Sequence, residues 1–199
     1  MKEINLTQGT PIWHYFRRTH IGASDISAAI GCNPWRSSYD LWIEKTVKDV
    51  KVEENDAMRR GTEMEVPARE LYEKLKGESF QPIVCEHDTI CYLSASLDGI
   101  SLDRKRALEI KCGEKSFKMA KEGIIPDYYQ YQCQQIYLVT DCETLDYMAF
   151  NGSDHIIIPV ERNDEMIENI KREAKLFHYC MENFISPNAI ERKFEVVNE

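Results

Sequence analysis

The segment SASLDGISLDRKRALEIK, Ser94–Lys111, is the part of this chain from which its fold can be read most directly. Its two ends have strand character and its middle is polar and charged, so it predicts a β-hairpin. Side chains alternate along a strand, so Glu109 and Lys111 share one face of the second strand while Leu108 and Ile110 share the other. The second strand therefore has an apolar face for packing and a polar face that can carry chemistry.

This polar face has the composition of a metal-assisted hydrolase. If the hairpin brings Asp98 beside Glu109, the two carboxylates can hold a divalent cation, with the amine of Lys111 next to it. Such a set can hydrolyse a phosphodiester, because the carboxylates place the metal and the lysine positions or deprotonates a water. Glu-x-Lys alone is a weak signal, and it recurs in polar surroundings at residues 173–175 and 191–193. The alternative is an ordinary exposed hairpin face.

Composition sets the class of protein. With 199 residues and 43% hydrophobic content, the chain fits one globular domain. We expect a cytoplasmic protein, because no apolar run has the length of a membrane span or the form of a signal peptide. The seven cysteines are scattered and indicate free thiols rather than an iron–sulfur cluster. The net charge of −9 disfavours nucleic acid only weakly, since basic residues need to line only one surface.

The order of predicted elements indicates an α/β or α+β fold with a mixed central sheet flanked by helices. We divide the single domain, residues 1–199, into a helical part (1–77), a sheet core (78–160) and a C-terminal helix with its tail (161–199). Pro67 should kink its helix or mark a restart. We expect, in chain order, a short helix through 13–16, helices over 25–30 and 39–46, a charged connection over 47–57, a helix over 58–76, strands over 79–85 and 89–93, the hairpin, a lysine-rich loop or short helix over 113–123, a helix over 127–139, strands over 144–150 and 155–160, and a helix from Asp164, its cap, to about 184.

Three residues near the N-terminus are candidates for binding. Ser24 stands at the start of a predicted helix, and a free hydroxyl there, beside arginines such as Arg17, makes an anion site. Trp13 lies on the side of its helix that should be buried. The structural alternatives are solvated arginines and a tryptophan that only packs in the core.

Further candidates lie on two later helices. Glu63 and Glu65 are either surface charges or, for one of them, a carboxylate that points at the metal. The helix over 127–139 carries four glutamines within six residues, among them Gln132 and Gln134. Amides can hydrogen-bond phosphates, bases or a nucleophilic water.

Taken together, six motifs resemble a known family, the lambda-exonuclease-like or YqaJ-type viral recombinase nucleases of the PD-(D/E)xK superfamily. The resemblance extends over most of the chain, and the motifs occur in the family's order. One departure is Leu97, where the superfamily has a nominal proline before the aspartate. The motifs are W-x3-R (13–17), I-G-A-S-D-I (21–26), G-T-E-M-E-x2-A-R (61–69), L-D-G (97–99), L-E-I-K-C (108–112) and Y-Q-x-Q-x-Q (129–134).

The resemblance implies a restriction-endonuclease-like core and a metal site within it. Asp98 and Glu109 would bind the catalytic Mg²⁺ or Mn²⁺, with the backbone carbonyl of Ile110 as a further ligand. Glu65, rather than Glu63, would complete a second site, which gives two ions. Lys111 would orient or activate the attacking water.

The same resemblance implies the remaining roles. Gln134 would be the active-site glutamine, with Gln132 nearby. Arg17 and Ser24 would hold the 5′-terminal phosphate of the strand being degraded, and Trp13 would lie near the DNA end.

We therefore expect a metal-dependent deoxyribonuclease that resects linear double-stranded DNA, 5′ to 3′ from phosphorylated ends, in phage-type homologous recombination. The family implies a ring-shaped homotrimer on DNA ends, a single-strand annealing protein as partner and no membrane contact. The compartment would be the bacterial host cytoplasm if the gene belongs to a phage or prophage. One alternative is an endonuclease or single-strand nuclease on this fold. The other is an inactive DNA-end-binding scaffold, which should lack a metal carboxylate or the lysine.

Overall fold

The computed structural model of this chain describes residues 1–47 and 56–189. The predicted charged connection and the C-terminal tail lie almost wholly outside these residues. The strands are β1 (Lys2–Ile4), β2 (Ile21–Gly22), β3 (Phe80–Glu86), β4 (Leu93–Ser101), β5 (Arg106–Cys112), β6 (Thr144–Phe150) and β7 (His155–Val160). The helices are α1 (Pro11–Thr19), α2 (Ile26–Ile30), α3 (Ser38–Thr46), α4 (Asp56–Lys76), α5 (Glu114–Lys121), α6 (Asp127–Thr140) and α7 (Asp164–Glu182).

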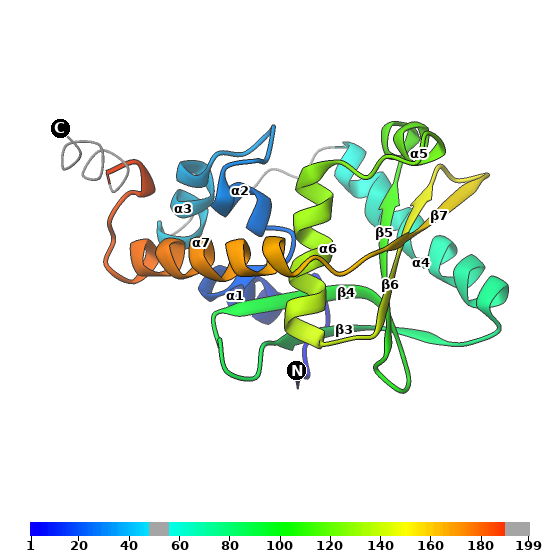
Figure 1. The fold of residues 1–199 in the computed structure, drawn as a ribbon, viewed down its shortest axis with the longest axis horizontal. Helices are drawn as coiled ribbons and strands as arrows, with labels where there is room; N and C mark the ends of the chain where they lie inside the picture. The colour runs from blue at the N-terminus through cyan, green and yellow to red at the C-terminus, as the bar shows by residue number, and fades with distance from the viewer. Residues whose placement is uncertain (48–55, 190–199) are drawn as a thin grey trace.

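Within the described residues, seven strands form one mixed sheet. Its order is β1-β3-β4-β5-β6-β7, with the short β2 beside β4. The pairs β2–β4 and β5–β6 are parallel, and the other pairs are antiparallel. Helices α4 and α6 lie on opposite sides of β5 and β6 (Figure 1). The predicted fold class, a mixed central sheet flanked by helices, is confirmed.

Two hydrophobic clusters fill the two faces of this sheet. The larger cluster joins α6 to β4 and β6 and to helices α2 and α7. The smaller cluster packs Ala68 and Tyr72 of α4 against Leu108 and Ile110 of β5. Ala107 belongs to the larger cluster, so consecutive residues of β5 face opposite layers, as strand geometry requires.

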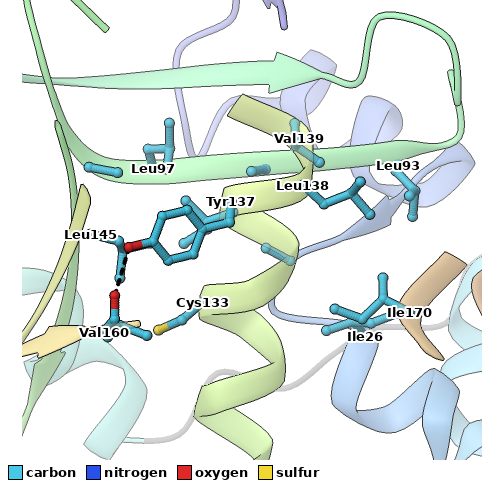
Figure 2. Packing of buried hydrophobic residues seen from close by; sticks show 14 of the residues in the cluster. Ile26, Leu93, Leu97, Cys133, Tyr137, Leu138, Val139, Leu145, Val160 and Ile170 are labelled. Atoms are coloured by element: carbon cyan, nitrogen blue, oxygen red, sulfur yellow. Dashed lines mark hydrogen bonds between the residues drawn. The ribbon is translucent and has the colours of Figure 1, made fainter. Parts of the chain in front are cut away.

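Helix α6 is the central element of the larger cluster, and its polar side chains hold the surrounding backbone. Figure 2 shows Tyr137, whose hydroxyl donates a hydrogen bond of 2.6 Å to the carbonyl of Val160 at the end of β7. The amide of Gln135 donates to the carbonyls of Ile21 (2.8 Å) and Ser94 (3.0 Å). These two bonds join β2 to β4, a parallel pair of only two registered positions.

Several boundaries differ from those predicted. The strand expected over 89–93 is wrong, because the ring of His87 accepts the backbone N–H of Thr89 (3.1 Å) and Ile90 (3.0 Å) and folds this segment into a turn. The helix α4 is one continuous element with Pro67 inside it, so no restart occurs. Asn163, not Asp164, caps α7. Strands β1 and β2 were not predicted.

None of the helices in the described ranges is long and apolar enough to cross a membrane.

Candidate active site

The site begins where β4 and β5 separate. Their antiparallel ladder contains only the pairs Gly99–Leu108 and Ile100–Ala107. At the next position, Oδ2 of Asp98 accepts a hydrogen bond of 2.6 Å from the backbone N–H of Ile110. The aspartate side chain thus takes the place of a backbone acceptor, and the Ile110 peptide lies against its carboxylate.

The presence of a glycine at position 99, directly after Asp98, has a steric explanation. A Cβ at Gly99 would lie 3.0 Å from Cβ of Phe80 and 3.4 Å from Cδ2 of Leu108. The first of these separations is tighter than most real Cβ contacts, so a larger residue at position 99 would force its neighbours to shift by a few tenths of an ångström. The L-D-G motif therefore combines a functional carboxylate with a packing requirement.

Glu109 and Lys111 share a face of β5, as the alternation predicts. Oε1 of Glu109 accepts hydrogen bonds from Nζ of Lys111 and from Nε2 of Gln132, the latter at 2.6 Å. Oε2 of Glu109 is buried and has no hydrogen-bond partner within the described part of the chain. A buried carboxylate oxygen left in this state costs stability unless a cation or donor reaches it.

The surroundings of Glu109 shift its protonation. Burial raises the pKa of Glu109 to about 7; Lys111 opposes this shift, while the neighbouring Asp98 adds to it. Burial also raises the pKa of Asp98, against the effect of Lys111. Burial alone would lower the pKa of Lys111, but Glu109 and Asp98 outweigh it and hold that pKa above its ordinary value. Lys111 is therefore the cation that balances this acidic cluster.

Helix α4 supplies the third carboxylate. Burial, and then the proximity of Asp98, raises the pKa of Glu65 to about 7. One turn later, Arg69 donates a hydrogen bond of 3.0 Å to the backbone carbonyl of Asp98. Glu63 is exposed. The structure thus brings Glu65, and not Glu63, towards the site.

The donors fit a hard divalent cation. Asp98, Glu109 and Glu65 offer carboxylate oxygens, the ligands that Mg²⁺ prefers, and Oε2 of Glu109 is buried without a partner. As the side chains stand, no three His, Cys, Asp or Glu residues among those described are close enough to enclose a metal ion. The ammonium group of Lys111 bonds Glu109 instead.

The two predicted glutamines have different positions. Gln132 contacts Glu109, but Gln134 is turned away from it. The amide of Gln134 donates to the carbonyl of Glu161 (2.9 Å) and accepts from the backbone N–H of Asn163 (2.8 Å). The expectation that Gln134 is the active-site glutamine is therefore corrected: it anchors the connection between β7 and α7, and Gln132 is the glutamine at the carboxylates.

The three N-terminal candidates form one cluster. The guanidinium of Arg17 lies 4.7 Å from the ring centroid of Trp13 and donates a hydrogen bond of 3.0 Å to Oγ of Ser24. Nε1 of Trp13 donates to Oγ of Ser96 at 3.0 Å. Ser96 and Asp98 are two residues apart on β4 and so share a face. The cluster consequently adjoins the carboxylates along β4.

Asp25 is buried beside this cluster and forms an ion pair with Arg17. It occupies the N-cap position of α2 without a side-chain cap bond. Its buried carboxylate pairs with Arg36 (2.6 Å), Lys45 (2.6 Å) and Arg17 (3.6 Å). Burial would raise the pKa of Asp25, but these three cations hold it well below its usual range. Since Arg36 also pairs with Glu44, three cations face two carboxylates and leave a positive excess.

Some residues at the site received no role from the sequence, although two motifs include Arg69 and Tyr129, whose ring centroid lies 4.9 Å from Nζ of Lys111. Arg69 follows Glu65 by four residues, and Tyr129 precedes Gln132 by three, so helical spacing could have placed both. No such signal identifies Ser96, whose contact with Trp13 joins residues 83 positions apart.

Comparisons with known proteins bear on this arrangement. Residues 12–143 match the sequence profile of the YqaJ-like viral recombinase domain. The chain is 27% identical over 165 residues to the uncharacterized protein YqaJ of Bacillus subtilis, covering 79% of this chain and 52% of that protein. It is 35% identical over 66 residues to protein D345L of African swine fever virus, covering 33% of this chain and 19% of that protein. The chain thus spans about half, or less, of these curated relatives.

Two exonucleases of known structure have folds similar to that of this chain. An alkaline exonuclease from Laribacter hongkongensis, LHK-Exo, superposes with a TM-score of 0.77 at 26% identity, covering 94% of this chain and 100% of that one. LHK-Exo has also been solved in complex with dAMP. A phage-related exonuclease from Haemophilus somnus 129PT superposes with a TM-score of 0.62 at 16% identity over 87% of this chain and 98% of that one, which shows the shared fold.

Proposed function

The chain belongs to the family of YqaJ-like viral recombinase domains, and from that membership we propose that it is a metal-dependent deoxyribonuclease that resects linear double-stranded DNA. The observation that carries the proposal is the meeting of Asp98, Glu109 and Lys111 where β4 and β5 separate, with one buried oxygen of Glu109 unpaired. Its similarity to an alkaline exonuclease of known structure supports the same activity.

In this proposal Asp98, Glu109 and the carbonyl of Ile110 hold one Mg²⁺ or Mn²⁺, and Glu65 completes the site of a second. When bound, the ions would neutralise the scissile phosphate and lower the pKa of a water. Lys111 gives up its contact with Glu109 and turns its ammonium group to the attacking water or the phosphate. Gln132 keeps Glu109 oriented through its hydrogen bond to Oε1.

The direction of resection would come from the cluster around Arg17. A guanidinium and the hydroxyl of Ser24 can hold a terminal phosphate, since charge-assisted hydrogen bonds to phosphate are strong. With Trp13 beside them and next to β4, a 5′-phosphate held there would place the adjoining strand at the carboxylates. We therefore propose 5′-to-3′ resection from phosphorylated ends.

The proposal extends to the surroundings of the enzyme. The activity would belong to homologous recombination in the bacterial host cytoplasm, with single strands passed to an annealing protein. The protein would act as a ring-shaped homotrimer. The match to a viral recombinase domain supports the role in recombination.

The direct test is a cleavage assay on linear duplex that carries a 5′-phosphate at one end and a 3′ label on the same strand. Wild type and Lys111→Ala would be compared in Mg²⁺ and in EDTA, with a closed circular plasmid alongside. Mg²⁺-dependent shortening from the 5′ end by wild type alone is the expected result. Nicking of the plasmid without resection would favour an endonuclease, and binding of ends without cleavage in Mg²⁺ or Mn²⁺ would favour an inactive scaffold.

A further inference from the structure

A row of aromatic rings leads from Lys111 to the protein surface. Nζ of Lys111 lies 4.9 Å from the ring centroid of Tyr129. Tyr129 meets Tyr128 edge to face with centroids 4.5 Å apart, and Tyr128 meets Trp35 in the same way at 4.8 Å. Nζ of Lys115 lies 5.0 Å from the centroid of Trp35. Tyr129, Tyr128 and Trp35, called the aromatic row below, thus connect two lysines, one of them in the candidate active site.

Trp35 is exposed but held in position. It keeps 61% of its surface accessible to solvent, although a tryptophan normally gains stability by burial. Oδ1 of Asn33 accepts the backbone N–H groups of Trp35 (2.9 Å) and Arg36 (3.0 Å), and Nδ2 of Asn33 donates to Oγ of Ser27 (3.0 Å). Arg36 is held in turn by Asp25. A fixed, exposed ring of this kind binds a flat partner at a low entropic cost.

The positive charge beside Trp35 favours a partner that carries phosphate groups. Helix α5 carries exposed Lys115, Lys118 and Lys121 at three-residue intervals, and Lys115 lies beside Trp35 at the outer end of the aromatic row. Although the whole chain has a net charge of −9, the lysines of this helix attract phosphate groups locally. Aromatic faces beside a row of cations are the arrangement that proteins use to bind unpaired nucleotides, because every base has a face that can stack.

We propose that the aromatic row is a stacking platform for unpaired bases of the DNA strand next to the candidate active site. Trp35 is the outer stacking ring, and Lys115 contacts the phosphate of the stacked nucleotide. The inference rests on the proposed function for the identity of the ligand as DNA. It adds a preference for single-stranded character beside the cleavage site, since a base inside a duplex has both faces covered by its stacked neighbours.

Binding of an oligothymidylate of about 12 nucleotides tests the platform without any cleavage. Fluorescence anisotropy in EDTA would compare wild type, Trp35→Ala, Trp35→Phe and Tyr179→Ala, a matched control at a 51% exposed aromatic residue of α7. Loss of one stacked base should weaken the binding of Trp35→Ala by about tenfold. Trp35→Phe should keep most of the affinity, and Tyr179→Ala should bind as wild type does. For a blunt duplex of equal length, the affinities of wild type and Trp35→Ala should differ much less.

Equal affinity of wild type and Trp35→Ala for the single strand would overturn the platform, whether or not wild type degrades DNA. Stacking that depends on Trp35, in a protein that cleaves no DNA, would leave the platform standing and remove the nuclease proposal. The rival occupant of this surface is a second copy of the chain. If Trp35→Ala lowers the mass measured by light scattering and weakens single-strand and duplex binding alike, Trp35 is a subunit contact and the platform is wrong.

Discussion

Nε2 of Gln132 donates a hydrogen bond of 2.6 Å to Oε1 of Glu109, the same oxygen that Lys111 contacts. Gln132→Ala should therefore free Glu109 to rotate and lower nuclease activity about 10- to 100-fold, as losing a group that orients a metal ligand commonly does. Its free energy of unfolding should change by less than about 1 kcal/mol, near the net value of a single hydrogen bond. Steady-state cleavage rates and urea unfolding would measure the two effects.

Gln134→Ala is the matched control on the same helix. Its side chain holds the backbone of Glu161 and Asn163 by two hydrogen bonds, so their loss should cost about 1 to 2 kcal/mol of stability. Activity per folded molecule should stay close to that of wild type. The reverse pattern, with activity lost in Gln134→Ala and kept in Gln132→Ala, would contradict the assignment made from the geometry.

Asp98→Asn and Glu109→Gln should abolish cleavage while the protein stays folded. The side-chain amide oxygen that Asp98→Asn introduces can still accept from the backbone N–H of Ile110, so the separation of β4 and β5 should persist. Without either carboxylate the metal would not be held, and the several kcal/mol by which it should stabilise the transition state would be lost. The cleavage rate should therefore fall by about a thousand-fold. Cleavage of labelled duplex and calorimetric titration with Mg²⁺ would check rate and binding separately. Retained activity in a cleanly purified variant would exclude that residue from the metal site.

Arg17→Ala should act selectively on the DNA end. Losing one charge-assisted hydrogen bond should reduce the rate on 5′-phosphorylated duplex by about tenfold and change the rate on 5′-hydroxyl duplex little. Arg18→Ala serves as control, because Arg18 donates to the backbone carbonyl of Lys45 rather than to Ser24. An equal loss on both kinds of end would show that Arg17 supports DNA binding in general.

Asp25→Asn should destabilise the protein at neutral pH by about 3 kcal/mol, because it leaves Lys45 buried without its carboxylate. The pKa of Asp25 is lowered on folding, so its contribution is complete above its unfolded value of 3.8 and is lost as pH falls below that towards the folded-state pKa. The stability difference between wild type and variant, measured by urea unfolding, should therefore shrink below about pH 3.8. A difference that stays constant as the pH falls from about 3.8 to about 2 would contradict the ion-pair assignment.

Gly99→Ala should destabilise the protein by about 1 to 3 kcal/mol, because the added methyl group would meet Phe80 at 3.0 Å. Gly61→Ala is the contrasting case: Gly61 is inside α4, and outside the neighbouring helix backbone no atom of the described residues lies within 4 Å of the position that its added methyl group would take. That substitution should stabilise by about 0.5 to 1 kcal/mol through helix propensity. Thermal unfolding would give the signs, and a stable Gly99→Ala protein would refute the packing argument.

The parts predicted well from the sequence depend on local patterns. Alternation placed Glu109 and Lys111 on one face of β5, and the bounds of β6 and β7 agree with those predicted. The strand expected over 89–93 failed because a single side chain, His87, bonds the backbone there and favours a turn over extension.

The parts predicted poorly depend on orientation and distance. Gln132 and Gln134 lie two residues apart on a helix and so point in nearly opposite directions, about 200° apart, and no local signal tells which one faces the sheet. The partners of Asp25 include Lys45, 20 positions away, and only the packing of α2 against α3 brings them together. Motif matching named residues that the structure brings together, and only the tertiary structure shows which of them contact one another.

The parallel pairing of β5 with β6 limits which insertions into β5 would keep Glu109 and Lys111 on their present face of the sheet. Seven registered pairs join the strands, from Arg106–Thr144 to Cys112–Phe150. One residue inserted early in β5 would turn Glu109 and Lys111 into the apolar layer beneath α4 and bring Leu108 and Ile110 out in their place. Two inserted residues would restore the facing and move the pair about 7 Å along the strand. Insertions within β5 therefore keep the facing of Glu109 and Lys111 only in even steps, which is a rule for anyone grafting the hairpin into another scaffold.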